Sequence, residues 1–205
     1  MTRKLVGAAP SGPTDAATLS YLDTHVGGII LVPKTSGQMI SPGFNTTTGG
    51  TLAYASGAVY GCHIPIPSSL TMDALGVRVV TTQTSTNAKL LLYSCDADGY
   101  PVTLVATGTV ACTSTGYVFG TTGSVALQAG MYWATLRTDI GTTVRFTCIT
   151  PTYVSQAGTW SGTTTSQYVP TSDVGTYASP SSTLSSWTPA AAGTTSVPHI
   201  VIRLA

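Results

Sequence analysis

Residues 88–110 read AKLLLYSCDADGYPVTLVATGTV, and this stretch decides the fold. An almost unbroken apolar run at 89–95 is followed by Asp96-Ala97-Asp98-Gly99, and a second run rich in β-forming residues covers 102–110. Asp bonds readily to nearby backbone amides and Gly accepts a positive φ, so the polar stretch predicts a tight turn. The pattern therefore predicts two neighbouring strands, and the first of them lies in the middle of a sheet because its apolar run is continuous.

Similar short strands are predicted along most of the chain after residue 35. They fall at 59–66, 72–81, 117–119, 124–127, 131–137, 144–149 and 199–204, with turns at Gly116, Gly123, Gly130 and Gly141. Pro65 and Pro67 place the strand at 59–66 on a sheet edge, because Pro cannot donate to a neighbouring strand. Strands at intervals of about 8–12 residues are typical of a sandwich or barrel.

The composition favours the same fold class. Charged residues make up only 7% of the chain, against roughly 25% in an ordinary soluble domain. All seven acidic residues are Asp, and Thr, Ser and Gly occupy the places that charges usually hold. Thr and Val suit a pleated surface, whereas Glu, Lys and Arg favour helices. The sequence thus predicts an all-β sandwich over residues 36–205, with 42% apolar residues available to fill its core.

Charge and hydropathy exclude several classes of partner. The net charge is +1 and the eight cationic residues are scattered, so we expect no nucleic-acid partner. No apolar run reaches the length of about 18 residues that a membrane span needs. The N-terminus does not resemble a secretory signal, which predicts folding in a reducing cytoplasm. We expect the four cysteines to be buried thiols rather than a metal or redox site, since no C-x-x-C pair occurs among Cys62, Cys95, Cys112 and Cys148.

Residues 1–35 differ from the rest and predict a short N-terminal anchor with a helix at 14–26. Leu19, Leu22 and Val26 form a narrow apolar stripe of two positions per heptad, which is the spacing of a coiled-coil seam. A helix below about 12–15 residues is marginal alone. It must therefore pack on its own domain, on a partner, or on copies of itself.

A long excursion at about 150–197 interrupts the strand rhythm. It has a single charge but carries five aromatic residues, too many for simple disorder, so we expect an ordered segment with a hairpin. Candidates for sugar contact are the aromatic residues with small polar flanks, namely Trp160, Trp187, Tyr168 and Tyr177. The same rings could instead pack the excursion onto the sandwich or contact another subunit. Trp133 lies in an apolar strand and is expected to be core.

Catalytic chemistry is poorly represented. Hydrolysis needs paired carboxylates or a nucleophile with its base, and no such motif surrounds the histidines at His25, His63 and His199. Asp96 and Asp98 are weak candidates for a cation, because the later ligands of a calcium loop and its closing Glu are missing. We expect no catalytic residue and no cofactor.

Two stretches resemble a known group of proteins. The first, GAAP (7–10) with TDAATLSYLD (14–23), resembles a segment of bacteriophage tail fibres that aligns chains in trimers. The second comprises TMDALGVRVV (71–80), residues 88–110 and LQAGMYWATLRTD (127–139), and is similar to the jelly-roll domains at the distal ends of phage fibres and in capsid-attached fibres. Together the two stretches cover about half of the chain.

The resemblance implies a non-enzymatic structural protein on the virion surface, assembled in the host cytoplasm. It implies a homotrimer held by another virion protein through the N-terminus, with an outward jelly-roll sandwich that binds host-surface glycan. No shaft separates the predicted helix from the sandwich, so a capsid decoration protein without sugar binding stays as the alternative. A polysaccharide-degrading enzyme is the third hypothesis.

Overall fold

The computed structural model describes residues 35–41, 51–53, 60–139, 143–149, 168–170, 176–184, 187–189 and 197–205. These residues belong to one unit, residues 34–205. The predicted helix at 14–26, with Leu19, Leu22 and Val26, lies outside the described residues. Among the described residues, no helix is long and apolar enough to cross a membrane.

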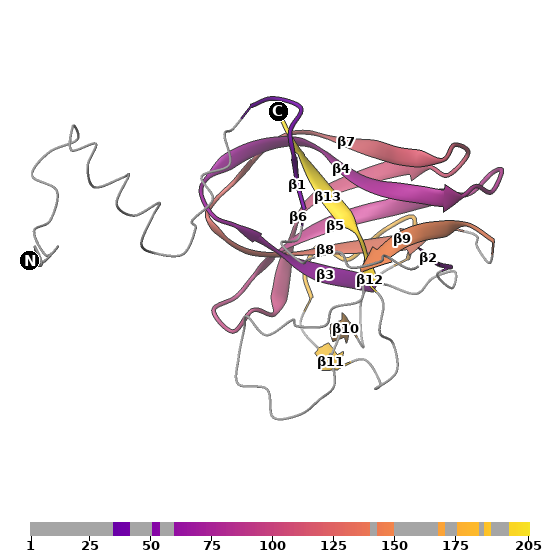
Figure 1. Cartoon of the computed structure of the whole chain (residues 1–205). Coiled ribbons are helices and arrows are strands. Elements are labelled where there is room, and N and C mark those ends of the chain that lie inside the picture. The colour runs from indigo at the N-terminus through magenta and orange to yellow at the C-terminus, as the bar shows by residue number, and fades with distance from the viewer. Residues whose placement is uncertain are drawn as a thin grey trace, which may run out of the picture. The chain divides into compact units, whose positions relative to one another are not determined.

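The described part of the chain is built from two main antiparallel sheets (Figure 1). The larger sheet contains β1 (Met39–Ile40), β2 (Thr51–Leu52), β4 (Leu70–Thr81), β7 (Gly116–Leu127), β9 (Arg145–Ile149), β12 (Val197–Pro198) and β13 (Ile200–Leu204). The smaller sheet contains β3 (Tyr60–Ile66), β5 (Asn87–Cys95), β6 (Pro101–Ala111) and β8 (Gly130–Thr138). A separate pair consists of β10 (Tyr168–Pro170) and β11 (Trp187–Pro189). The structure thus confirms the predicted all-β antiparallel two-sheet sandwich.

Eight of these strands pair in a nested order. β1 pairs with β13, β3 with β8, β4 with β7 and β5 with β6. Along the sequence each of these pairs encloses the next, from β1 and β13 on the outside to β5 and β6 on the inside. Two further pairings, β13 with β4 and β8 with β5, join the nested pairs into sheets. The result is one layer ordered β1-β13-β4-β7 and another ordered β3-β8-β5-β6. As predicted, β3 lies at an edge and β5 lies in the middle of its sheet.

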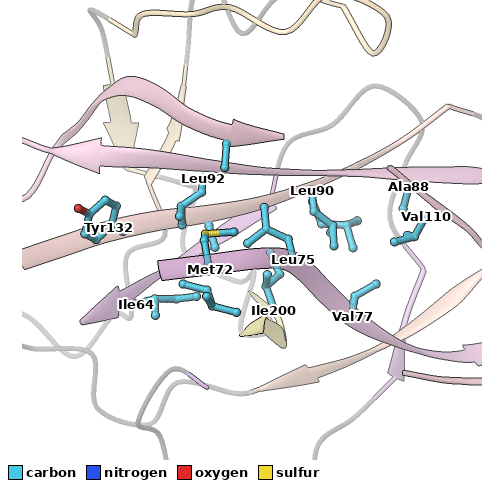
Figure 2. Packing of buried hydrophobic residues seen from close by; sticks show 14 of the residues in the cluster. Ile64, Met72, Leu75, Val77, Ala88, Leu90, Leu92, Val110, Tyr132 and Ile200 are labelled. Carbon is cyan, nitrogen blue, oxygen red and sulfur yellow. The ribbon is translucent and has the colours of Figure 1, made fainter. Parts of the chain in front are cut away.

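The main core fills the space between the two layers. Figure 2 shows Met72, Leu75 and Val77 of β4 in the same cluster as Leu90 and Leu92 of β5, and all five are almost completely buried. Burying one such side chain contributes about 1.5–3 kcal/mol relative to leaving it in water. The inner face of β4 therefore supplies one side of the core.

The turn predicted at Gly123 is wrong. β7 runs without interruption from Gly116 to Leu127, where two strands at 117–119 and 124–127 were expected. Gly123 has a φ of 74°, and the register with β4 shifts between Thr121 and Val125. An inserted loop of this kind is a β-bulge, in which one strand carries extra residues and Gly supplies the left-handed conformation. The glycine marks a positive φ correctly, but the chain continues in the same direction.

The two layers meet at one edge through a backbone contact between β6 and β7. Gly108 pairs with Leu90 and Gly120 pairs with Leu75, so both glycines lie on the inner faces of their sheets. A Cβ atom placed on Gly108 would lie 2.6 Å from the carbonyl oxygen of Gly120, and one placed on Gly120 would lie 2.5 Å from the amide nitrogen of Thr109. Only glycine at both positions allows the sandwich to close here.

Replacing either glycine is expected to open this edge. Gly108→Ala forces a methyl group against backbone, which cannot move aside as a flexible side chain can, and should lower the free energy of unfolding by about 3 kcal/mol. Urea unfolding followed by circular dichroism measures the change. Thr109→Ala, at an exposed neighbouring position, is the control and should cost less than about 1 kcal/mol. A Gly108→Ala protein as stable as this control would contradict the close approach.

Candidate functional site

The outer face of the smaller sheet carries a second apolar cluster. Leu91 and Tyr93 of β5 alternate with the residues of the main core and point to the opposite side, where they pack with Trp133 and Leu184. All four side chains are buried. The unbroken apolar run at 89–95 is therefore explained by a strand that is covered on both faces. Trp133 is core, as predicted, but it belongs to this outer cluster.

Part of the long excursion covers this face. The backbone of residues 182–184 pairs with the edge of β6, where the Leu184 amide donates to the Val102 carbonyl (2.8 Å) and the Leu104 amide donates to the Ser182 carbonyl (2.9 Å). In addition, the Tyr93 hydroxyl donates to the Ser181 carbonyl over 3.1 Å. The excursion is thus fastened by backbone pairing at the edge and by side chains on the face.

Tyr177, one of the predicted sugar-contact residues, belongs to this covering segment. The Lys89 ammonium lies 4.8 Å from the centre of the Tyr177 ring and donates to the Ala178 carbonyl over 3.2 Å. Burial, with a smaller contribution from the charge of Asp139, raises the pKa of Tyr177 to about 12. Among the roles considered for Tyr177, these contacts favour packing over sugar contact, because a cation occupies a ring face that a sugar would use.

Two other predicted residues are brought together by β10 and β11. Tyr168 is opposite Pro189, and Pro170 is opposite Trp187. Directly opposed positions share a face of an antiparallel pair, as do alternate positions along each strand. Positions 168 and 187 are therefore diagonal neighbours on one face of this ladder. Trp160 lies outside the described residues.

The Asp96–Gly99 segment forms the predicted turn. One carboxylate oxygen of Asp96 accepts hydrogen bonds from the amides of Asp98 (3.0 Å) and Tyr100 (2.8 Å), and Gly99 has a φ of 85°. His63 of β3 donates to the Gly99 carbonyl over 2.9 Å, and burial lowers the pKa of His63. The Asp96 side chain is used to hold its own turn. In the described part of the chain, no group of three His, Cys, Asp or Glu residues could hold a metal ion.

Cys95, Cys112 and Cys148 are free thiols. Burial raises the pKa of Cys95 to about 12 and that of Cys112 to about 11, and a nearby Asp carboxylate adds to each shift. Because the thiolate is the nucleophilic form, neither group is activated near neutral pH. Cys148 is buried. These environments favour a packing role.

No protein-family model matches the sequence, and no curated protein matches it significantly. The class that the structure itself defines is an all-β antiparallel two-sheet sandwich whose smaller sheet is partly covered by a long excursion.

The free energy of unfolding should fall at alkaline pH, because Tyr93 is buried under the covering segment. Burial raises the pKa of Tyr93 to about 12, whereas an unfolded Tyr ionises near pH 10. Between these values the unfolded chain releases a proton that the folded chain retains, so the contribution of Tyr93 to stability is complete below pH 10 and is lost as the pH rises toward 12. The raised pKa values of Tyr177, Cys95 and Cys112 add to the same alkaline fall. Tyr93→Phe should flatten this fall in urea-unfolding measurements across that range.

The control is Ser181→Ala, which leaves the carbonyl that accepts the Tyr93 hydrogen bond in place. This variant should show the wild-type dependence on pH. An equally steep fall in Tyr93→Phe would mean that other groups account for the alkaline instability.

Proposed function

We propose that the protein is a non-enzymatic structural protein of a bacteriophage virion, a short trimeric fibre or spike whose sandwich faces outward and binds host-surface glycan. The observation that carries the proposal is the nested strand order. Two facing layers of four strands, ordered β1-β13-β4-β7 and β3-β8-β5-β6, match the doubly wound Greek-key arrangement of a jelly roll. Jelly rolls are typical of viral capsid and lectin domains.

The arrangement of the excursion supports glycan contact. Positions 168 and 187 are neighbours on one face of the β10–β11 ladder. Both residues are aromatic, and Trp187 has a polar residue on each side. An aromatic ring beside polar groups suits the apolar face and the hydroxyl rim of a sugar. Weak contacts of this kind become strong when several copies bind one surface at once, which is what a trimeric appendage provides.

The trimer is proposed from the N-terminal stripe. Leu19, Leu22 and Val26 would form the seam between three helices, and the same segment would be held by another virion protein. The virion surface is the proposed location, after assembly in the host cytoplasm. The free state of the described cysteines is compatible with folding there.

A capsid decoration protein without sugar binding is the second candidate. Tyr177 supports it, because this residue is engaged in packing rather than presented as an open ring. The low charge of the chain also suits permanent association with a shell.

The oligomeric state is the first test. The full-length protein should have the mass of a trimer by light scattering, and removal of residues 1–28 should release monomers, because the seam is lost while the sandwich is left whole. A Leu19→Asp, Leu22→Asp double variant provides a test without truncation. Monomers from the full-length chain would contradict the seam.

Sugar binding is tested with tryptophan fluorescence. Cell-wall polysaccharide from a bacterium that supports the phage should change the emission of the wild-type protein, and Trp187→Ala or Trp160→Ala should remove the change. Trp133 is fully buried and remains as an internal reference for folding. The absence of any response to host envelope extracts would favour the decoration protein.

A further inference from the structure

The outer face of the larger sheet carries a group of aromatic and charged residues that the sequence patterns did not single out. Phe119 of β7 is opposite Gly76 of β4, which in turn is opposite Val201 of β13. The next alternate positions on β7 and β13 are Tyr117 and Arg203. These positions share one face, which is opposite to the face that carries the main core.

Two aromatic rings form the centre of this group. The ring centres of Tyr117 and Phe119 are 6.4 Å apart and their planes differ by 24°. This separation is close to the rise of about 6.6 Å between alternate residues of a strand. The rings are therefore displaced along β7 with nearly parallel planes in an offset stack, and we call this pair the aromatic strip.

The strip is held in place from below and from both ends. A Cβ atom on Gly76 would lie 2.5 Å from the Phe119 ring, so this glycine provides the space that the ring occupies above the sheet. The Arg203 guanidinium lies over the Phe119 ring, with its central carbon 5.1 Å from the ring centre, so Phe119 supports this charged group from below. At the other end, the His199 ring meets Tyr117 edge to face, with ring centres 6.4 Å apart. Such packing fixes the rings before any ligand arrives.

Polar groups next to the rings are also fixed. Arg203 donates two parallel hydrogen bonds to Asp73, Nε to Oδ1 over 2.8 Å and Nη2 to Oδ2 over 3.0 Å. The hydrogen bond from Arg203 lowers the pKa of Asp73, which keeps the carboxylate charged. About a third of each side chain is exposed, 30% for Arg203 and 38% for Asp73. On the other flank, His199 Nε2 and Ser41 Oγ are 2.7 Å apart.

This chemistry fits a saccharide better than it fits a protein partner. The C–H face of a pyranose ring can lie on Tyr117, which is 42% exposed. An adjoining guanidinium and carboxylate supply the donors and acceptors that neighbouring hydroxyl groups need. A stable protein interface instead buries about 800 Å² on each partner around an apolar centre. Here exposed Arg78 is directly opposite Tyr117 and interrupts the apolar area.

We propose that Tyr117, Asp73 and Arg203, supported by the Phe119 ring under Arg203, form a binding surface for a neutral pyranose oligosaccharide. The surface lies on the sandwich itself and is separate from the β10–β11 ladder. The proposal therefore goes beyond the host-glycan contact at position 187 and does not need the N-terminal trimer.

The test titrates the full-length protein with chitopentaose, cellopentaose and maltopentaose and follows backbone amide resonances by NMR. At least one of the sugars should shift the amides of β4, β7 and β13. Tyr117→Ala should weaken that binding by about tenfold. Arg203→Lys keeps the charge but loses the planar pair of donors, and it should weaken binding to a smaller extent.

The matched control is Tyr100→Ala, because Tyr100 is an exposed tyrosine on a different part of the sandwich, with 38% of its surface accessible. It should bind the sugar as the wild type does. Tyr117→Leu removes the ring but keeps an apolar side chain, so it should fold even if Tyr117→Ala does not. Thermal unfolding checks that every variant is folded. Tyr117→Leu should lose sugar binding but unfold at the same temperature as the wild type.

Three results would overturn the proposal. The first is that none of the three sugars shifts these amides. The second is that Trp187→Ala abolishes binding while Tyr117→Ala does not, which would leave the host-glycan function in place and remove this surface. The third is that the same amides shift with protein concentration and that Tyr117→Ala lowers the mass in solution, which would make this face a contact between copies of the chain.

Discussion

Burial of β5 on both faces is the constraint on which the rest of the structure depends. Leu90 and Leu92 fill the space between the sheets, while Leu91 and Tyr93 point outward and cannot be left in water. Residues 176–184 meet this need by covering the outer side and pairing with the edge of β6. Part of the long excursion is thereby needed for the fold, while Tyr117 on the outer face of the larger sheet stays exposed.

Local sequence patterns predicted the fold class and most of the strands because alternation and turn residues act over short distances. The turn at Asp96 and the continuous apolar run of β5 needed no knowledge of distant residues. Gly123 shows the limit of local patterns, because a glycine with a positive φ occurs both in bulges and in turns. Only the pairing with β4 distinguishes the two at this position. The short strands β1, β2 and β12 depend on long-range pairing and carry too few residues to form a pattern.

The candidate sites were harder to predict for the same reason. Small polar flanks drew attention to the aromatic residues of the excursion, yet Tyr177 meets Lys89, which lies far away in the sequence. The strip on β7 was missed because Tyr117 and Phe119 look like ordinary strand residues. Their role becomes visible only when the register brings Gly76 beneath one ring and Arg203 over it.

The glycine contact between β6 and β7 also bears on how so weakly charged a chain avoids forming fibrils. An open strand edge can recruit the edge of another molecule, and most proteins discourage this with charged side chains. Here one part of β6 is capped by residues 182–184, and another part is pressed against β7 at Gly108. Part of the β6 edge is thus shielded within the fold, so geometry limits edge-to-edge pairing at this strand, where the sequence provides few charges.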